Sequence, residues 1–198
     1  MSFPPPSAAA LDHAARVGTA LSAAIERAGG WLPFSEFMDL ALYAPSLGYY
    51  MAGARKLGPE GDFTTAPELS PLFGATLASV AMDVLEQPTD EILEIGAGSG
   101  ALAAALLRSL EERGRLPARY RILELSPELR ERSRDYLRST MPHLFDRIVW
   151  IDRLPESFSG LVLGNEVLDA MPVTIARVTS AGIEEGGVTR AVDRNFTW

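Results

Sequence analysis

Apolar positions recur with two different periods along this chain, and the period changes near residue 90. Before that point they follow helical spacing in three stretches, and after it short apolar runs alternate with further helical patterns. The predicted elements are helices 8–28, 35–42 and 70–85, strand 91–95, helix 100–113, strand 119–125, helix 127–139 and strands 147–151 and 160–164. This alternation predicts an α/β fold with a Rossmann-like, doubly wound parallel sheet of about four core strands, buried on both faces.

Proline and glycine mark the segments that flank these elements. Residues 1–7 include three consecutive prolines, which predicts a flexible lead, and 53–67 is rich in glycine and proline, which predicts a long loop. Residues 173–198 show short apolar runs around glycine turns, which predicts a β-meander. The expected division is therefore 1–7, then 8–88 as N-terminal helices with a covering loop, 89–172 as the α/β core, and 173–198.

Composition and charge narrow the classes of function. With 198 residues and 47% hydrophobic content, the chain can bury one sizeable core. Its net charge of -8 argues against binding to nucleic acid or an anionic membrane, and favours a neutral or basic protein partner. There are no cysteines and only two histidines, His13 and His143, so we expect no disulfide and no metal site. Without an apolar run of membrane-spanning length or a signal sequence, a cytoplasmic protein is expected.

Residues 91–100 read Glu-Ile-Leu-Glu-Ile-Gly-Ala-Gly-Ser-Gly, a strand that runs into three alternate glycines. Glycine tolerates positive φ and lets the backbone approach a bound nucleotide closely. Glu94 precedes the first glycine by two residues, where it would repel a dinucleotide pyrophosphate at the start of the next helix. S-adenosylmethionine (AdoMet) instead carries a cationic ammonium and a cationic sulfonium. The motif therefore predicts AdoMet binding by Glu94, Gly96, Gly98 and Gly100.

A nicotinamide cofactor stays open as an alternative, because the same glycines followed by Ala101 fit the G-x-G-x-x-A pattern. Glu124 ends the second strand, 24 residues after Gly100, and can accept hydrogen bonds from both ribose hydroxyls of either cofactor. Its other interpretation is an acid that favours the helix starting at Pro127. No obvious residue for hydride handling, such as a Tyr-x-x-x-Lys pair, accompanies the nicotinamide interpretation.

Polar residues follow the strand at 160–164, and ligands of open α/β sheets lie beyond the carboxyl ends of the strands. Asn165 is predicted to contact the cofactor, and Glu166 and Asp169 are candidates for holding a guanidinium or amine beside the sulfonium. Asn165 and Asp169 could instead cap a turn. Thr65 and Glu68 stand before a predicted helix, where they form either a wall over the methionine carboxylate of AdoMet or a simple helix start.

Three stretches, at 32–50, 61–68 and 165–173, together resemble the MidA family of class I AdoMet-dependent methyltransferases. The resemblance implies methyl transfer from AdoMet to a protein arginine, with a subunit of NADH dehydrogenase (respiratory complex I) as the known kind of target. It also implies a role in complex I assembly and a mitochondrial location in eukaryotic relatives. A non-catalytic assembly module on the same fold stays open.

The resemblance also assigns site residues. The positions that match cofactor-binding residues of class I methyltransferases are Glu94, Gly96, Gly98, Gly100 and Glu124. Glu166 stands where arginine methyltransferases keep a substrate-binding glutamate, whereas the second glutamate of that pair is absent and Asp169 is taken as its stand-in.

Members of this family are usually far longer, and a complete class I sheet has seven strands where this sequence predicts four. We therefore expect either a fragment or a sheet that another chain completes, which leaves a homodimer open.

Overall fold

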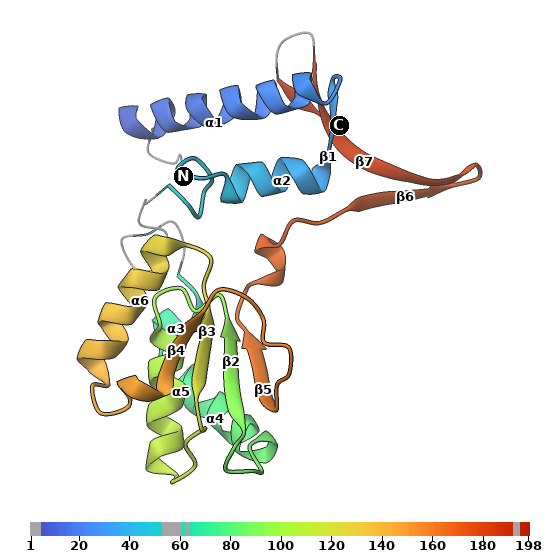
Figure 1. The fold of residues 1–198 in the computed structure, drawn as a ribbon. Helices are drawn as coiled ribbons and strands as arrows, with labels where there is room; N and C mark the ends of the chain where they lie inside the picture. Colours follow the sequence, from blue (N-terminus) through green and yellow to red (C-terminus); the bar gives the residue numbers. More distant parts are fainter. Residues whose placement is uncertain (1–4, 53–60, 62–63, 192–194) are drawn as a thin grey trace. The chain divides into compact units, whose positions relative to one another are not determined.

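The structure is a computed structural model that describes residues 5–52, 61, 64–191 and 195–198 (Figure 1). Its internal contacts divide the chain into two units. The first, called the sheet unit, is Arg55–Asp169, and the second, called the arm unit, combines Met1–Ala54 with Ala170–Trp198. The division expected from the sequence differs from these two units, because it placed all helices before residue 88 in one segment, 8–88, and kept 173–198 as a separate segment. Residues 1–4 of the expected lead at 1–7, and most of the expected loop at 53–67, lie outside the described residues.

The sheet unit contains four parallel strands in the order β4-β3-β2-β5. They are β2 (Glu91–Ile95), β3 (Tyr120–Leu123), β4 (Ile148–Ile151) and β5 (Gly160–Gly164), coloured from green to orange in Figure 1. The predicted parallel α/β sheet of four strands is confirmed. All four carboxyl ends lie at one edge of the sheet, which is where such a sheet binds ligands.

Helices of the sheet unit pack on one face of this sheet. They are α3 (Ala66–Leu69), α4 (Leu72–Val84), α5 (Ala101–Glu112) and α6 (Pro127–Thr140), with short 3-10 turns η1 (Phe145–Arg147) and η2 (Leu168–Ala170). The core lies between α4, α5, α6 and alternate strand residues such as Ile92, Tyr120 and Ile122, each 0% exposed. Along β3 and β4 these buried residues alternate with half-buried ones, whose side chains point to the other face of the sheet. The sequence predicted burial of the sheet on both faces. The second face is only partly covered, because the described segment 152–159 between β4 and β5 contains no helix.

Local sequence explains where the helices of the sheet unit begin and how closely they pack. The Ser126 side chain accepts a hydrogen bond from the Leu129 N–H, and Pro127 follows at the first helical position of α6. Gly74 on α4 lets that helix approach α5 closely, because a Cβ at Gly74 would lie 2.6 Å from the Ala105 Cβ.

The arm unit has its own antiparallel sheet, in the order β1-β7-β6, with β8 also paired to β7. Its elements are α1 (Ala8–Arg27), β1 (Trp31–Pro33), α2 (Phe34–Tyr43), β6 (Ile175–Thr179), β7 (Gly182–Arg190) and β8 (Phe196–Thr197). A small core of Ile25, Leu32 and Val188 joins α1, β1 and β7. The unit is thus built from segments at the two ends of the sequence.

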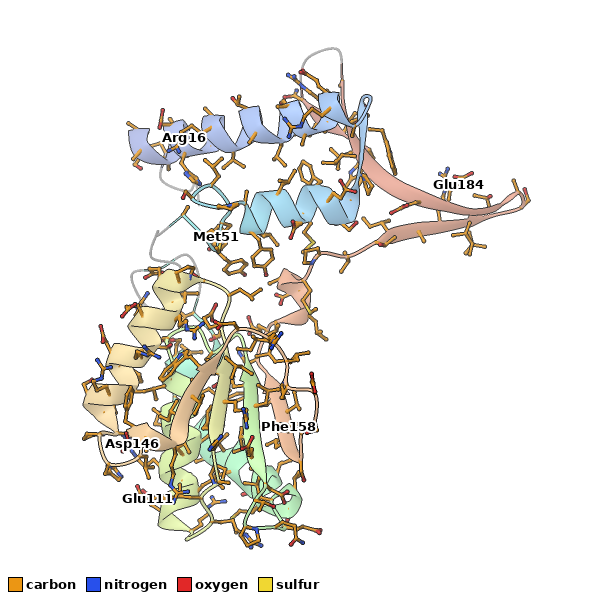
Figure 2. All side chains as sticks on the ribbon, in the orientation of Figure 1. Arg16, Met51, Glu111, Asp146, Phe158 and Glu184 are labelled. Carbon is orange, nitrogen blue, oxygen red and sulfur yellow. The ribbon has the colours of Figure 1, made fainter. Side chains whose placement is uncertain are left out.

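The β6-β7 hairpin agrees with the predicted meander in its turn at Gly182, where φ is 135°. Gly186 and Gly187 form no turn, because both lie within β7, where Gly187 pairs with Pro33 of β1. Glu184, labelled in Figure 2, forms an exposed ion pair with Arg177 across the hairpin, at 2.6 Å between Nη2 and Oε2.

Within the described residues, none of the helices combines the length and the apolar character needed to cross a membrane. The same described part of the chain contains no cluster of three or more histidine and acidic side chains suited to a metal ion.

Candidate cofactor site

The turn between β2 and α5 is built on three glycines in the left-handed region of the backbone. Gly96, Gly98 and Gly100 have φ of 67°, 56° and 83°, a range that other residues adopt only with strain. The Gly96 N–H donates to the Leu123 carbonyl at 2.9 Å, which ties the start of the turn to β3. These conformations explain why glycine occupies all three positions.

Packing constrains two of these glycines as well. A Cβ at Gly96 would lie 3.0 Å from Cγ2 of Val167, and a Cβ at Gly100 would lie 3.3 Å from side-chain atoms of Leu137 and Ser133 on α6. Val167 also lies against Gly164, the last residue of β5. Sequence reasoning missed Val167, because an apolar residue between two candidate acids carries no chemical signal.

Glu94 is a buried carboxylate beside this turn, with 2% of its surface exposed. The Tyr120 hydroxyl donates to its Oε2 at 2.8 Å. Burial raises the Glu94 pKa to about 7, while the hydrogen bond from Tyr120 opposes that rise and the nearby charge of Glu124 adds to it. No other described residue donates a hydrogen bond to Glu94. Its Oε1 atom thus accepts no hydrogen bond from the part of the chain that the structure describes.

Glu124 joins the glycine turn to the start of α6. Its Oε2 accepts the Gly98 N–H at 3.1 Å, and its Oε1 accepts the Ser126 N–H at 3.0 Å. Burial raises the Glu124 pKa, and the hydrogen bonds from Ser126 and Gly98 partly offset this effect. Both interpretations of Glu124 are compatible with this geometry. Each oxygen accepts one backbone hydrogen bond and keeps lone-pair capacity for a ribose hydroxyl.

Glu68 on α3 reaches the same turn, because its Oε1 accepts a hydrogen bond from the Ser99 hydroxyl. The Ser99 Oγ in turn accepts the Ala101 N–H of α5 at 3.2 Å. Thr65 precedes α3 and is half-buried, but its side chain does not cap that helix. The structure thus brings Glu68 to the glycine turn. Ser99, the hydroxyl residue within the glycine run, was missed as a functional residue, although its place between two glycines was a signal.

The candidate substrate residues follow β5. Glu166 has a φ of 53°, an uncommon conformation for a residue with a side chain, and strained backbone of this kind is enriched at functional sites. The Glu166 and Asp169 side chains are exposed, while Asn165 is half-buried. Asp169 lies inside η2 rather than before it. The carboxylates of Glu166 and Asp169 therefore stay accessible to a cationic substrate.

The glycine turn is surrounded by acids. Glu94 precedes it, Glu124 binds it through Gly98, and Glu68 binds it through Ser99. A phosphate at the start of α5 would face these three carboxylates, whereas a cation would be attracted to them. The arrangement fits the ammonium and sulfonium of AdoMet better than the pyrophosphate of a nicotinamide dinucleotide.

Comparison with known proteins supports this chemistry. Residues 74–198 match the model of the family described as "Putative S-adenosyl-L-methionine-dependent methyltransferase". Among curated relatives, the mitochondrial protein arginine methyltransferase NDUFAF7 of Danio rerio is 29% identical over an alignment of 184 residues that covers 80% of this chain and 43% of the relative. Its Drosophila melanogaster homolog is 32% identical over 168 residues, covering 73% of this chain and 38% of the relative.

Two solved structures of COG1565 superfamily proteins from Burkholderia thailandensis are similar over nearly the whole chain. One, bound to S-adenosyl-homocysteine, has a TM-score of 0.89 and 45% identity over 99% of this chain and 52% of its own. The other has a TM-score of 0.85 and 44% identity over 99% and 50%. This likeness confirms the fold class predicted from the sequence. The chain spans about half the length of these structures, and less than half of the two curated relatives.

Proposed function

The chain belongs to the family of S-adenosyl-L-methionine-dependent methyltransferases whose model it matches, and from this premise we propose that it methylates an arginine side chain of a protein. The observation that carries the proposal is the buried Glu94 carboxylate, which has one hydrogen-bond donor among the described residues and lies beside a glycine turn. A desolvated carboxylate of this kind is stabilised by a cation. AdoMet supplies such a cation, together with a methyl group activated by its sulfonium.

The described residues fit this cofactor part by part. Glu94 would pair with the methionine ammonium, Glu124 would accept the ribose hydroxyls, and the three glycines would let the backbone approach the ligand. Glu68 would add a further negative charge beside the turn. Its proposed place differs from the sequence interpretation as a wall over the methionine carboxylate, since two carboxylates repel each other and the ammonium is the better partner.

Glu166 and Asp169 would bind the guanidinium of the substrate arginine. Both are exposed beyond the carboxyl end of β5, and a carboxylate can accept two guanidinium N–H groups at once. In the proposed reaction a guanidinium nitrogen bonds to the methyl carbon as the bond from carbon to sulfur breaks. S-adenosyl-homocysteine and a methylated guanidinium result, and one proton leaves to solvent. The task of the two acids is then to orient the nitrogen in line with the methyl group.

Protein arginine as substrate is supported by the names of the curated relatives. The resemblance to the MidA family makes a subunit of NADH dehydrogenase the first substrate to try. The net charge of -8 also favours a neutral or basic protein over nucleic acid.

Calorimetry tests the cofactor first. AdoMet should bind to the purified protein, and NADH should not. Glu124→Ala should weaken AdoMet binding by about 100-fold, because it removes charged acceptors of two hydrogen bonds. Glu112→Ala, an exposed acid at the end of α5, is the matched control and should bind normally. Binding of NADH in place of AdoMet would overturn the proposal.

Labelled AdoMet tests the transfer. After incubation with a cell extract or a complex I subunit, label should appear in a protein band as methylarginine. Glu166→Gly relieves the positive φ and removes the carboxylate, so labelling should fall on the order of 100-fold while AdoMet binding is retained. Cofactor binding without label in any protein would instead indicate a non-catalytic assembly module.

A further inference from the structure

Tyr120, the first residue of β3, places a hydroxyl group deep inside the sheet unit. The side chain is 0% exposed, and its hydroxyl lies 2.8 Å from Oε2 of Glu94. In the parallel register Tyr120 stands opposite Ile92 of β2. Ile92 comes two residues before Glu94, so the side chains of all three residues lie on the same face of the sheet. The phenol ring therefore reaches along β2 toward the carboxyl end of the strand, where the glycine turn begins.

Glu94 has no other favourable partner among the described residues. Its second neighbour in the sheet, β5, carries no titratable side chain, and neither does the first turn of α5. The remaining titratable group that acts on it is Glu124, whose charge is of the same sign. Among the described residues, the Tyr120 hydroxyl is therefore the group that favours the ionised form of Glu94, against burial and the charge of Glu124.

Packing alone does not account for this pair. Tyr120 belongs to an apolar core with Ile92, Ile122 and Leu106, where a phenylalanine ring would bury the same carbon surface. Burying a hydroxyl and a carboxylate costs free energy, and apolar replacements of buried polar pairs are often neutral or stabilising. A pair of this kind at the entrance to a ligand turn indicates a role in binding.

We propose that Tyr120 is a positioning residue of the cofactor site, whose hydroxyl holds Glu94 in one orientation and supports its negative charge, leaving Oε1 for the ammonium of the cofactor. This inference rests on the proposed contact between Glu94 and AdoMet. It goes beyond that contact, because it assigns to a residue of β3 an influence on the pH range in which Glu94 is ionised.

The inference has a signature in the pH dependence of binding. A cationic ligand pairs with ionised Glu94, so affinity rises with pH until the carboxyl is fully ionised. The Glu94 pKa is about 7, and the hydrogen bond from Tyr120 lowers it. Loss of that bond should therefore move the midpoint of the affinity profile to higher pH.

The test is calorimetric titration with S-adenosyl-homocysteine, which carries the ammonium, from pH 5.5 to 8.5. Wild-type affinity should rise with a midpoint near pH 7. For Tyr120→Phe the midpoint should move up by about one unit, since hydrogen bonds to charged groups have about this strength. Binding should then be about tenfold weaker at pH 6 and recover most of the difference at pH 8.5. Tyr136→Phe, on the exposed side of α6, should follow the wild type.

Two further proteins distinguish an effect of the hydrogen bond from an effect of packing. In a Glu94→Gln background, Tyr120→Phe should leave no pH-dependent effect. Incorporation of fluorotyrosine, a stronger hydrogen-bond donor, should move the wild-type midpoint to lower pH, and this measurement does not depend on how well Tyr120→Phe folds.

An affinity loss that is equal at every pH, or an unmoved midpoint in both Tyr120→Phe and the fluorotyrosine protein, would assign Tyr120 to packing and overturn the inference. The contact between Glu94 and the cofactor would survive that result if Glu94→Gln weakens binding at pH 8. Normal binding by Glu94→Gln would instead remove the contact itself.

Discussion

Glu94 should make the stability of the protein depend on pH when no cofactor is present. Its pKa is 4.5 in the unfolded chain and about 7 when folded, so between these values the folded chain keeps a proton that the unfolded chain has released. The free energy of unfolding therefore falls as pH rises through this window. Glu94→Gln cannot ionise, and relative to wild type it should gain about 2 kcal/mol between pH 5 and 7.5. Urea midpoints at the two pH values measure this gain, and an equal difference at both would contradict it.

At the same scale, the sequence indicated the residues of the site better than their partners. Glu94 and Glu124 could be singled out because acids stand at the ends of two predicted strands beside a glycine run. The contacts that fix these carboxylates could not be predicted from local sequence. Tyr120 lies 26 residues from its partner Glu94, and Gly98 lies 26 residues from its partner Glu124. The roles predicted for Asn165, Glu166 and Asp169 stay predictions.

Most predicted elements lie within two or three residues of the helices and strands in the structure, because hydrophobic periodicity and capping residues act locally. Strand 91–95 and strand 160–164 match β2 and β5 at both ends. The strand β1 was missed, since Trp31–Pro33 is too short for a periodic signal and forms by pairing with β7. The short helix α3 was also missed because of its length, and its first two residues fall within the expected loop at 53–67.

Helix α5 allows a matched test of the glycine turn, because a glycine with positive φ stands at each end. Gly100 precedes the helix with φ of 83°, and Gly114 follows it with φ of 67° in a Schellman arrangement, with hydrogen bonds from Gly114 to Glu111 and from Arg115 to Leu110. Either glycine replaced by alanine should cost about 1–2 kcal/mol in left-handed strain.

Gly100→Ala should cost more than Gly114→Ala, because its Cβ would press on Leu137 and Ser133 whereas nothing lies within 4 Å of a Cβ at Gly114. Gly100→Ala should also weaken AdoMet binding, and Gly114→Ala should not. Urea unfolding and calorimetry on the two variants measure both differences. Equal binding by the two variants would show that the backbone of this turn does not need glycine for the ligand.

At the scale of the whole molecule, periodicity revealed where the α/β pattern starts but not which segments fold together. The arm unit joins β1, near residue 32, to β7, near residue 188, and such long-range antiparallel pairing has no local signature. Helix α4 belongs with the sheet because its buried residues Ala78 and Ala81 pack into the core of the sheet unit. All residues of the candidate cofactor site lie in the sheet unit.

This separation predicts that damage to the arm sheet spares cofactor binding. A Cβ at Gly187 would lie 2.5 Å from the Leu32 carbonyl oxygen, so Gly187→Val should break the pairing of β1 with β7 and destabilise the arm unit by about 2 kcal/mol or more. Gly18→Ala is the control in the same unit: nothing lies within 4 Å of its Cβ, and alanine inside α1 should stabilise it by up to about 1 kcal/mol. Hydrogen exchange should show faster exchange in β1 and β7 of Gly187→Val while β2 and α5 stay protected.

Calorimetry should give AdoMet affinity within about twofold of wild type, because Glu94, Glu124 and the glycine turn make their contacts inside the sheet unit. A large loss of affinity would mean that the arm contributes directly to the site.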